Sequence, residues 1–229
     1  RSHRIGQQIC RTLHEAGFNI VIHYNSSIEA AEKLASEFNQ IRDNSAQIIQ
    51  AELSDINDIN QLCNAINTLD LLVNNASVFY PTPVNEINQA DYHKIMNTNL
   101  MGPLFLSTTL SQKLANSQGN IINIVDIHAD RPLKNHTIYN ISKSAVAMMT
   151  KTLAKELAPN VRVNGISPGS ILWPKNEAKL SQSQQQSMLN KIALKRQGSA
   201  LDIANTTLFL AQSNYITGQI ITVDGGRTL

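Results

Sequence analysis

Six short runs rich in Ile and Val recur along this 229-residue chain, and segments long enough for amphipathic helices separate them. The runs have the length of strands and are bounded by turn residues. Strands that alternate with helices predict a parallel sheet covered on both faces. The expected strands are residues 19–23, 46–51, 69–74, 120–125, 161–166 and 219–223.

The segments between the runs place apolar residues at helical spacing. Right-handed crossovers between such units predict a Rossmann-type, doubly wound parallel sheet with helices on both faces. We therefore expect a single α/β domain over residues 1–229, with ligands bound at the carboxyl ends of its strands. The expected helices are residues 6–16, 27–38, 90–116, 139–157 and 201–211.

The first residues look like a phosphate loop that runs directly into a helix, with no strand before it. A doubly wound sheet needs that strand at its centre. A strand and its turn take about ten residues, so we expect about ten residues upstream of Arg1. The expected domain over residues 1–229 therefore lacks its N-terminal strand.

Composition excludes several classes of protein. Hydrophobic residues make up 42% of the chain, which suffices for a buried core. The net charge of +2 comes from scattered residues, which predicts no contact with nucleic acid or an anionic membrane. No apolar run is long enough to span a bilayer or to form a signal peptide, so we expect a cytoplasmic protein. Two cysteines and isolated histidines at 128 and 136 predict neither a disulfide framework nor a metal site.

The start of the first helix has features of a phosphate site. Free N–H groups and the helix dipole bind phosphate, and Gly6 lets the backbone approach a pyrophosphate closely. The glycine pattern is incomplete, and a plain helix start preceded by two arginines, Arg1 and Arg4, explains the segment nearly as well.

The residues after the first run bear on the choice of dinucleotide. NAD-dependent folds usually place an acidic residue here to hold the ribose 2′-hydroxyl, and this chain has none. Hydroxyls and an amide, with Arg4 able to approach, favour the 2′-phosphate of NADP(H). These residues after the first run are also typical of an ordinary turn that caps the next helix. Its residues are His23, Tyr24, Asn25, Ser26 and Ser27.

Tyr139 and Lys143 are four residues apart at the start of a long helical segment, so they share one helical face. A lysine ammonium beside a tyrosine lowers the pKa of the phenol by stabilising the phenolate, which makes a proton donor near working pH. The spacing alone is common, and a surface pair is its ordinary explanation. Other motifs in a fixed order change that interpretation.

Together these motifs resemble the short-chain dehydrogenase/reductase family over essentially the whole chain. In that family, most members place a serine thirteen positions before the tyrosine; here Asp126 stands there. Asp126, Arg4 in the loop and the segment NNASVFYPTP look like the pteridine reductase branch. The motifs are the phosphate loop, NNA at 74–76, Asn99, YNISK at 139–143, RVNGISPG at 162–169 and ITGQIITVDGG at 216–226.

The resemblance implies an NADPH-dependent enzyme that reduces a pterin, a dihydropterin or dihydrofolate to the tetrahydro form. It implies catalysis by Asp126, Tyr139 and Lys143, with Phe79 and the nicotinamide on either side of the pterin ring. Stacking on Phe79 would add about 0.5–1.5 kcal/mol beyond area burial. The substrate site would comprise Arg4, Ser77, Phe79, Asp126 and Tyr139. The cofactor site would comprise Arg4, Ile5, His23, Tyr24, Asn25, Ser26, Ser27, Glu52, Leu53, Asn75, Ala76, Ser77, Asn99, Tyr139, Lys143, Pro168, Gly169 and Ser170.

Two other functions stay open at this point. A carbonyl reductase of the same family, for example one that acts on 3-oxoacyl thioesters, lacks support because an ionised Asp126 cannot donate a hydrogen bond to a carbonyl. A dinucleotide-binding sensor without catalysis would not need the Tyr139/Lys143 pair. The resemblance also implies a homotetramer built through the two long helices, and Trp173 either lines a lid over the substrate or packs in the core.

Overall fold

The computed structural model describes residues 3–171 and 181–229, with side chains from Ile5 onward. The expected alternation of strands and helices is confirmed, and each strand lies within two residues of its predicted bounds. The strands are β1 (Ile20–Tyr24), β2 (Ala46–Gln50), β3 (Leu71–Asn74), β4 (Asn120–Ile124), β5 (Arg162–Pro168) and β6 (Ile220–Val223).

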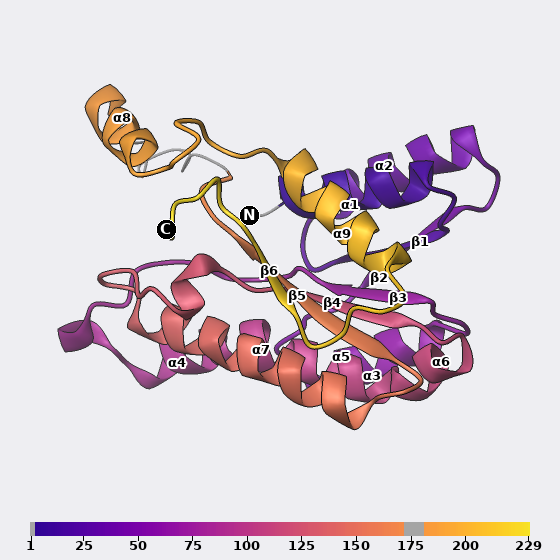
Figure 1. The fold of residues 1–229 in the computed structure, drawn as a ribbon. Helices are drawn as coiled ribbons and strands as arrows, with labels where there is room; N and C mark the ends of the chain where they lie inside the picture. Colours follow the sequence, from indigo (N-terminus) through magenta and orange to yellow (C-terminus); the bar gives the residue numbers. More distant parts are fainter. Residues whose placement is uncertain (1–2, 172–180) are drawn as a thin grey trace.

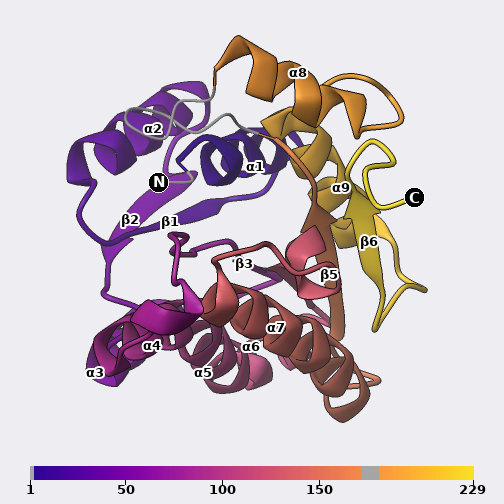
Figure 2. The same ribbon diagram turned by 90° about the vertical axis from the view of Figure 1, so that its left-hand side faces the viewer.

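All the strand pairs are parallel, as expected for a doubly wound α/β fold. The strands form two sheets: β1 pairs with β2, and the order β3-β4-β5-β6 makes the second sheet. Among the described residues, β1 and β3 share no ladder, and Figure 2 shows the β1–β2 pair set apart from β3. The polar segments that follow the strands meet at their carboxyl ends.

Helices cover both faces of the strands (Figure 1). α1, α2 and α9 lie on one face, and α3 to α7 lie on the other. The helices are α1 (His3–Glu15), α2 (Ile28–Ile41), α3 (Ile56–Ala65), α4 (Gln89–Met96), α5 (Gly102–Thr109), α6 (Ser111–Asn116), α7 (Thr137–Glu156), α8 (Gln182–Asn190) and α9 (Ala200–Gln212).

Strand β4 shows why both faces are covered. All five of its residues are buried, and its side chains alternate between two apolar clusters. Ile121 packs in the cluster with α3, α5 and α7, whereas Ile122 packs in the cluster with α1, α2 and α9. A strand that is buried on both faces is expected to be mostly apolar, and the one polar side chain inside β4, Asn123, is hydrogen-bonded to Asn74 and Thr150.

The predicted single helix over residues 90–116 is wrong. A π-helical turn, Asn97–Met101, separates α4 from α5, and α6 follows as a distinct helix. Gly102 packs so tightly that a Cβ there would lie 2.8 Å from the carbonyl oxygen of Leu53. Pro103, which has no N–H to donate, follows directly. α3 is not among the helices expected from the sequence, and its N-cap residue Asp55 accepts a hydrogen bond from the amide of Asn57.

Candidate active site

Segments from three elements meet at the carboxyl ends of β3 and β4. Residues 75–77 follow β3, and Asp126 follows β4 at the N-cap of the short helix Ile127–Ala129. Tyr139 and Lys143 lie in the first two turns of α7. Polar side chains at this edge are what the doubly wound fold predicts for a ligand site.

Tyr139 and Asp126 form a direct pair. The Tyr139 hydroxyl donates a hydrogen bond to Oδ2 of Asp126 at 2.7 Å, and Oδ1 of the same carboxylate accepts the amide of His128 at 2.9 Å. Burial and the negative charge of Asp126 hold the pKa of Tyr139 well above 10.0. The expectation that Lys143 lowers the pKa of this phenol is therefore wrong for this arrangement, because burial and the carboxylate dominate.

Lys143 is fully enclosed, with only 3% of its surface exposed. Its Nζ donates to the carbonyl oxygen of Ile124 at 2.9 Å and lies 5.8 Å from the centre of the Tyr139 ring. Burial lowers the pKa of Lys143 from 10.5 to about 8, against an opposing effect of Asp126. A buried ammonium beside a hydroxyl–carboxylate pair is a perturbed cluster typical of functional sites.

Asn99 lies in the π-helical turn and connects the segment after β3 to α7. Its Nδ2 donates to the carbonyl of Val78 at 3.0 Å and to Oγ of Ser142 at 3.1 Å. Its Oδ1 accepts the Val78 amide at 2.8 Å and the Ser77 hydroxyl at 3.2 Å. Ser142 in turn donates to the carbonyl of Tyr139 at 2.7 Å. Asn99 is one of the cofactor residues expected from the sequence, whereas Ser142 is not among the expected site residues.

Phe79 presents an aromatic surface at the same place, with 51% of its area exposed. Its ring stacks on His136 with centroids 4.7 Å apart and meets Tyr139 at 4.8 Å in an edge-on arrangement. Thr82, further along the loop, forms an isolated parallel bridge with His136. Asp126, Tyr139 and Phe79 are therefore brought together, as expected.

The residues at the ends of β1 and β2 form a second group. Asn25 donates to Oε2 of Glu52 at 2.6 Å, and Oε1 of Glu52 accepts the amide of Ser54 at 3.1 Å. His23 Nε2 bonds the carbonyl oxygen of Ala51 at 2.9 Å, and burial lowers the pKa of this histidine. Tyr24 ends β1 and Ser27 is the N-cap residue of α2, with the exposed Ser26 between them.

A cavity of about 430 Å³ opens beside this second group. Asn25, Glu52 and Ser54 line one side of it. Another side is lined by residues of α4 and the π-helical turn that are not among the expected site residues: His93, Lys94, Asn97 and Thr98. No motif marked them, because only their position across the fold from Glu52 brings them to the site.

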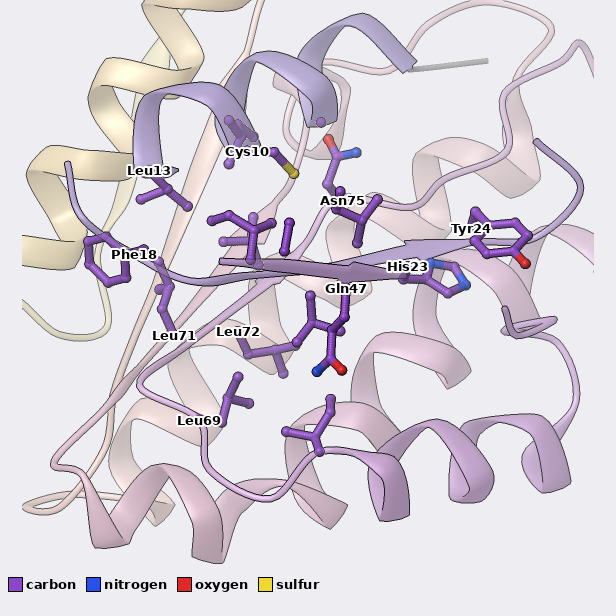
Figure 3. Close-up of a pocket in the computed structure, with 18 of the residues that line it drawn as sticks. Cys10, Leu13, Phe18, His23, Tyr24, Gln47, Leu69, Leu71, Leu72 and Asn75 are labelled. Atoms are coloured by element: carbon purple, nitrogen blue, oxygen red, sulfur yellow. The ribbon is translucent and has the colours of Figure 1, made fainter. Parts of the chain in front are cut away.

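The first turn of α1 lies against the segment after β3. A Cβ at Gly6 would lie 2.8 Å from Nδ2 of Asn75, so the Asn75 side chain would have to move to admit one, and Figure 3 shows Asn75 directed toward α1. Ile5 packs on the apolar cluster beneath the helix. The side chain of Arg4 and all of Trp173 lie outside the described residues.

The remaining predicted residues lie at the edges of the site. Leu53 is buried against Gly102, and Ala76 packs on the cluster with α3 and α5. Pro168 ends β5, and a Cβ on Gly169 would lie 2.5 Å from that of Asp224. The hydroxyl of Ser170 accepts a hydrogen bond from Gln197 at 3.2 Å.

Two findings on the described part of the chain concern other kinds of site. Within residues 3–171 and 181–229, no three His, Cys, Asp or Glu side chains come together in a group that could hold a metal ion. None of the helices described there has the length and apolar character needed to cross a membrane.

Comparison with known proteins shows the same architecture. A family model described as Enoyl-(Acyl carrier protein) reductase matches residues 1–228. Pteridine reductase 1 of Leishmania tarentolae is 31% identical, over 99% of this chain and 93% of its own length. A 3-oxoacyl-[acyl-carrier-protein] reductase of Staphylococcus aureus is 33% identical, over 98% of this chain and 94% of its own.

Solved structures agree closely. A blue fluorescent protein from a metagenomic library, solved in complex with NADPH, superposes with a TM-score of 0.90 and 31% identity, over 99% of this chain and 94% of that one. A mutant of a Serratia marcescens short-chain dehydrogenase/reductase superposes with a TM-score of 0.89 and 27% identity, over 99% of this chain and 94% of that one. The chain therefore belongs to the short-chain dehydrogenase/reductase family of oxidoreductases.

Proposed function

We propose that this protein is an NADPH-dependent pteridine reductase that converts a pterin, a dihydropterin or dihydrofolate to its tetrahydro form. The observation that carries the proposal is the 2.7 Å hydrogen bond from Tyr139 to Asp126 beside the half-exposed ring of Phe79. A carboxylate accepts N–H groups, and an aromatic face stacks on a flat heterocycle. A pterin offers both features, whereas a simple ketone offers neither.

The residues present fit NADPH. Gly6 at the start of α1 leaves the backbone bare beside Asn75, which suits a pyrophosphate at a helix N-terminus. The stretch from His23 to Ser27 carries no carboxylate of its own, and Lys94, which lines the adjoining cavity together with Glu52, would be the cation for a 2′-phosphate. When bound, NADPH supplies the hydride.

Asp126 and Tyr139 provide the proton. The Tyr139 hydroxyl donates to Asp126 in the structure, so it would turn from Oδ2 to the substrate nitrogen, give up its proton there, and regain one from solvent by way of Asp126. The pair then acts as a relay whose outer member, Asp126, is partly exposed to solvent. The raised pKa of Tyr139 keeps the phenol protonated until the substrate nitrogen takes its proton.

Lys143, Phe79 and Ser77 hold the reactants. Lys143, whose Nζ lies 5.8 Å from the centre of the Tyr139 ring, would hold the nicotinamide ribose when NADPH is bound. Phe79 stacks on the pterin ring and sets the distance for hydride transfer. Ser77, whose hydroxyl donates to Oδ1 of Asn99, would contact both the cofactor and the substrate.

A 3-oxoacyl thioester reductase is the second candidate, because relatives with that name are equally similar to this chain. It would have to work with Asp126 where a hydrogen-bond donor to the carbonyl is needed. A dinucleotide-binding sensor is the third, and it would show NADPH binding without turnover.

The test is oxidation of NADPH at 340 nm with a dihydropterin, dihydrofolate or a 3-oxoacyl thioester as substrate. Tyr139→Phe and Asp126→Asn should each lower turnover of the dihydropterin about 10²- to 10⁴-fold, the range for losing an acid–base group. Tyr80→Phe is the matched control, because Tyr80 donates to another carboxylate, Asp91, at 2.9 Å. Turnover of the thioester alone would reject the proposal.

We also propose a cytoplasmic homotetramer assembled through α5 and α7. Phe105, Ile141 and Met148 lie on these helices and are 40%, 54% and 62% exposed. Leu106, by contrast, is buried in the core of the chain itself. Equilibrium sedimentation that gives four chains per particle would support this, and a monomer would reject it.

A further inference from the structure

The ring of Phe79 is itself stacked on another ring, the imidazole of His136. The two ring centroids lie 4.7 Å apart and the ring planes are 19° from parallel. A stacked imidazole covers one face of a phenyl ring, and 51% of Phe79 is nevertheless exposed, so its opposite face is open. A flat ligand can therefore stack on Phe79 from the side that turns away from His136.

His136 is held in place by hydrogen bonds of its own. Its Nδ1 lies 2.9 Å from the carbonyl oxygen of Lys134. A carbonyl oxygen only accepts hydrogen bonds, so Nδ1 carries the proton of the neutral imidazole. The backbone amide of His136 donates to the carbonyl of Leu133 at 3.3 Å, and its carbonyl accepts the amide of Asn140 at 2.9 Å. Both the ring and the backbone of His136 are thus fixed at the start of α7.

The ring of Phe79 depends on packing for its orientation, because a phenyl ring has no hydrogen-bonding group. The backbone before it is held by Asn99, which bonds both the amide and the carbonyl of Val78. Among the described residues, the aromatic contacts of Phe79 are those with His136 and Tyr139. His136 is the N-cap residue of α7 and Tyr139 follows three residues later, so one helix end presents both rings to Phe79.

We propose that His136 is a positioning residue for the substrate: its imidazole packs on one face of Phe79, and the heterocycle of the substrate stacks on the opposite face. The three rings form a stack in which Phe79 is the middle layer. The inference rests on the proposed function for the identity of the heterocycle, a pterin. His136 acts through Phe79 and is not a catalytic residue.

The opposite arrangement makes the opposite prediction. If the substrate used the face that His136 covers, the imidazole would have to leave before the substrate could bind. Removal of the imidazole would then lower the KM for the substrate instead of raising it. The sign of the change in KM therefore decides between the two arrangements.

The experiment compares steady-state kinetics with NADPH and dihydrobiopterin for the parent enzyme, His136→Ala, His136→Phe and Lys134→Ala. Lys134→Ala is the matched control, because its exposed side chain lies on the same loop and its carbonyl, which His136 bonds, is kept. Thermal melting checks that each variant is folded.

We expect His136→Ala to raise the KM for dihydrobiopterin about two- to tenfold, the factor for the loss of one aromatic contact, with kcat within about twofold of the parent. His136→Phe keeps a flat ring and should restore the KM to within about twofold of the parent. In a Phe79→Ala background, His136→Ala should leave the KM unchanged, because no ring remains for it to position.

A KM that is unchanged or lowered in His136→Ala would overturn the proposal, and so would a KM in His136→Phe as high as that in His136→Ala. An effect of His136→Ala that persists at full size in the Phe79→Ala background would also overturn it, because His136 would then act by another route.

A proton NMR spectrum of the ligand-free protein separates this inference from the proposed function. The Cε1 proton of His136, assigned by its loss in His136→Phe, should shift when Phe79→Ala removes the stacked ring. The absence of a shift would overturn the contact between the two rings, even if dihydrobiopterin is reduced. A parent enzyme that does not reduce dihydrobiopterin would reject the proposed function and, with it, the pterin layer of the stack.

Discussion

Replacing Lys143 with methionine isolates the cost of burying its charge. Lys143 is 3% exposed, and burial lowers its pKa from 10.5 to about 8. Because the folded-state pKa is the lower one, the unfolded chain binds more protons between these two values. The contribution of Lys143 to the free energy of unfolding therefore rises with pH between these two pKa values. Methionine has a similar length and does not titrate.

The size of the effect follows from the two pKa values. The folded pKa is about 8 and the unfolded pKa is 10.5. Between pH 7 and pH 9, the free energy of unfolding of the native protein should therefore rise by about 1 kcal/mol relative to that of Lys143→Met. Urea unfolding of both proteins at both pH values measures this gain. Groups that titrate alike in the two proteins cancel in the comparison.

Asp126 and Tyr139 face Lys143, so the same comparison is repeated in an Asp126→Asn background. There the carboxylate no longer raises the pKa of Lys143, and the gain should begin at lower pH. Relative stability that is unchanged to within about 0.3 kcal/mol between pH 7 and pH 9, or that falls, would refute the account of a buried charge.

Three further substitutions test other parts of the site. Phe79→Ala should raise the KM for a dihydropterin about three- to tenfold in steady-state assays, the value of a lost stacking contact, without changing thermal stability, because the ring is half exposed. Asn99→Ala should lower the free energy of unfolding in urea by about 2 kcal/mol or more, because it leaves buried partners unsatisfied. Gly6→Ala should displace Asn75 and weaken NADPH binding in a fluorescence titration, while melting temperature is kept or raised, because alanine favours a helix. These assignments would be contradicted by an unchanged KM in Phe79→Ala, an unchanged stability in Asn99→Ala, or an unchanged NADPH affinity in Gly6→Ala.

Much of the fold was predictable from the sequence because its signals are local. Runs such as 120–125 are Ile-rich and bounded by turn residues, and β4 covers Asn120–Ile124. The pairing of Asp126 with Tyr139 was suggested by a resemblance, and the structure brings the two side chains to 2.7 Å. The break between α4 and α5 was not predictable from apolar periodicity, which continues through the π-helical turn.

The role of Asn99 was beyond sequence reasoning for a different reason. Its partners lie 21 and 43 residues away, at Val78 and Ser142, so only the assembled fold shows that one amide holds both segments. Lys94 became visible in the same way, since it and Glu52 line the same cavity of about 430 Å³ from distant parts of the chain. Long-range hydrogen bonds such as those of Asn99 are not marked by any periodic pattern in the sequence.

The anchoring of the loop after β3 explains how Phe79 stays exposed in a fixed position. Asn99 holds Val78 on one side of it. On the other side, the Thr82 amide donates to the carbonyl of Asn135 before α7, and the Thr82 hydroxyl accepts the amide of Ile138 in α7. His136, from that same segment, stacks on the ring of Phe79. An exposed aromatic ring on a loop held at both ends cannot fold back to bury its area, so its apolar face stays available to a flat ligand. This geometry supports a stacking role more strongly than the identity of the residue alone.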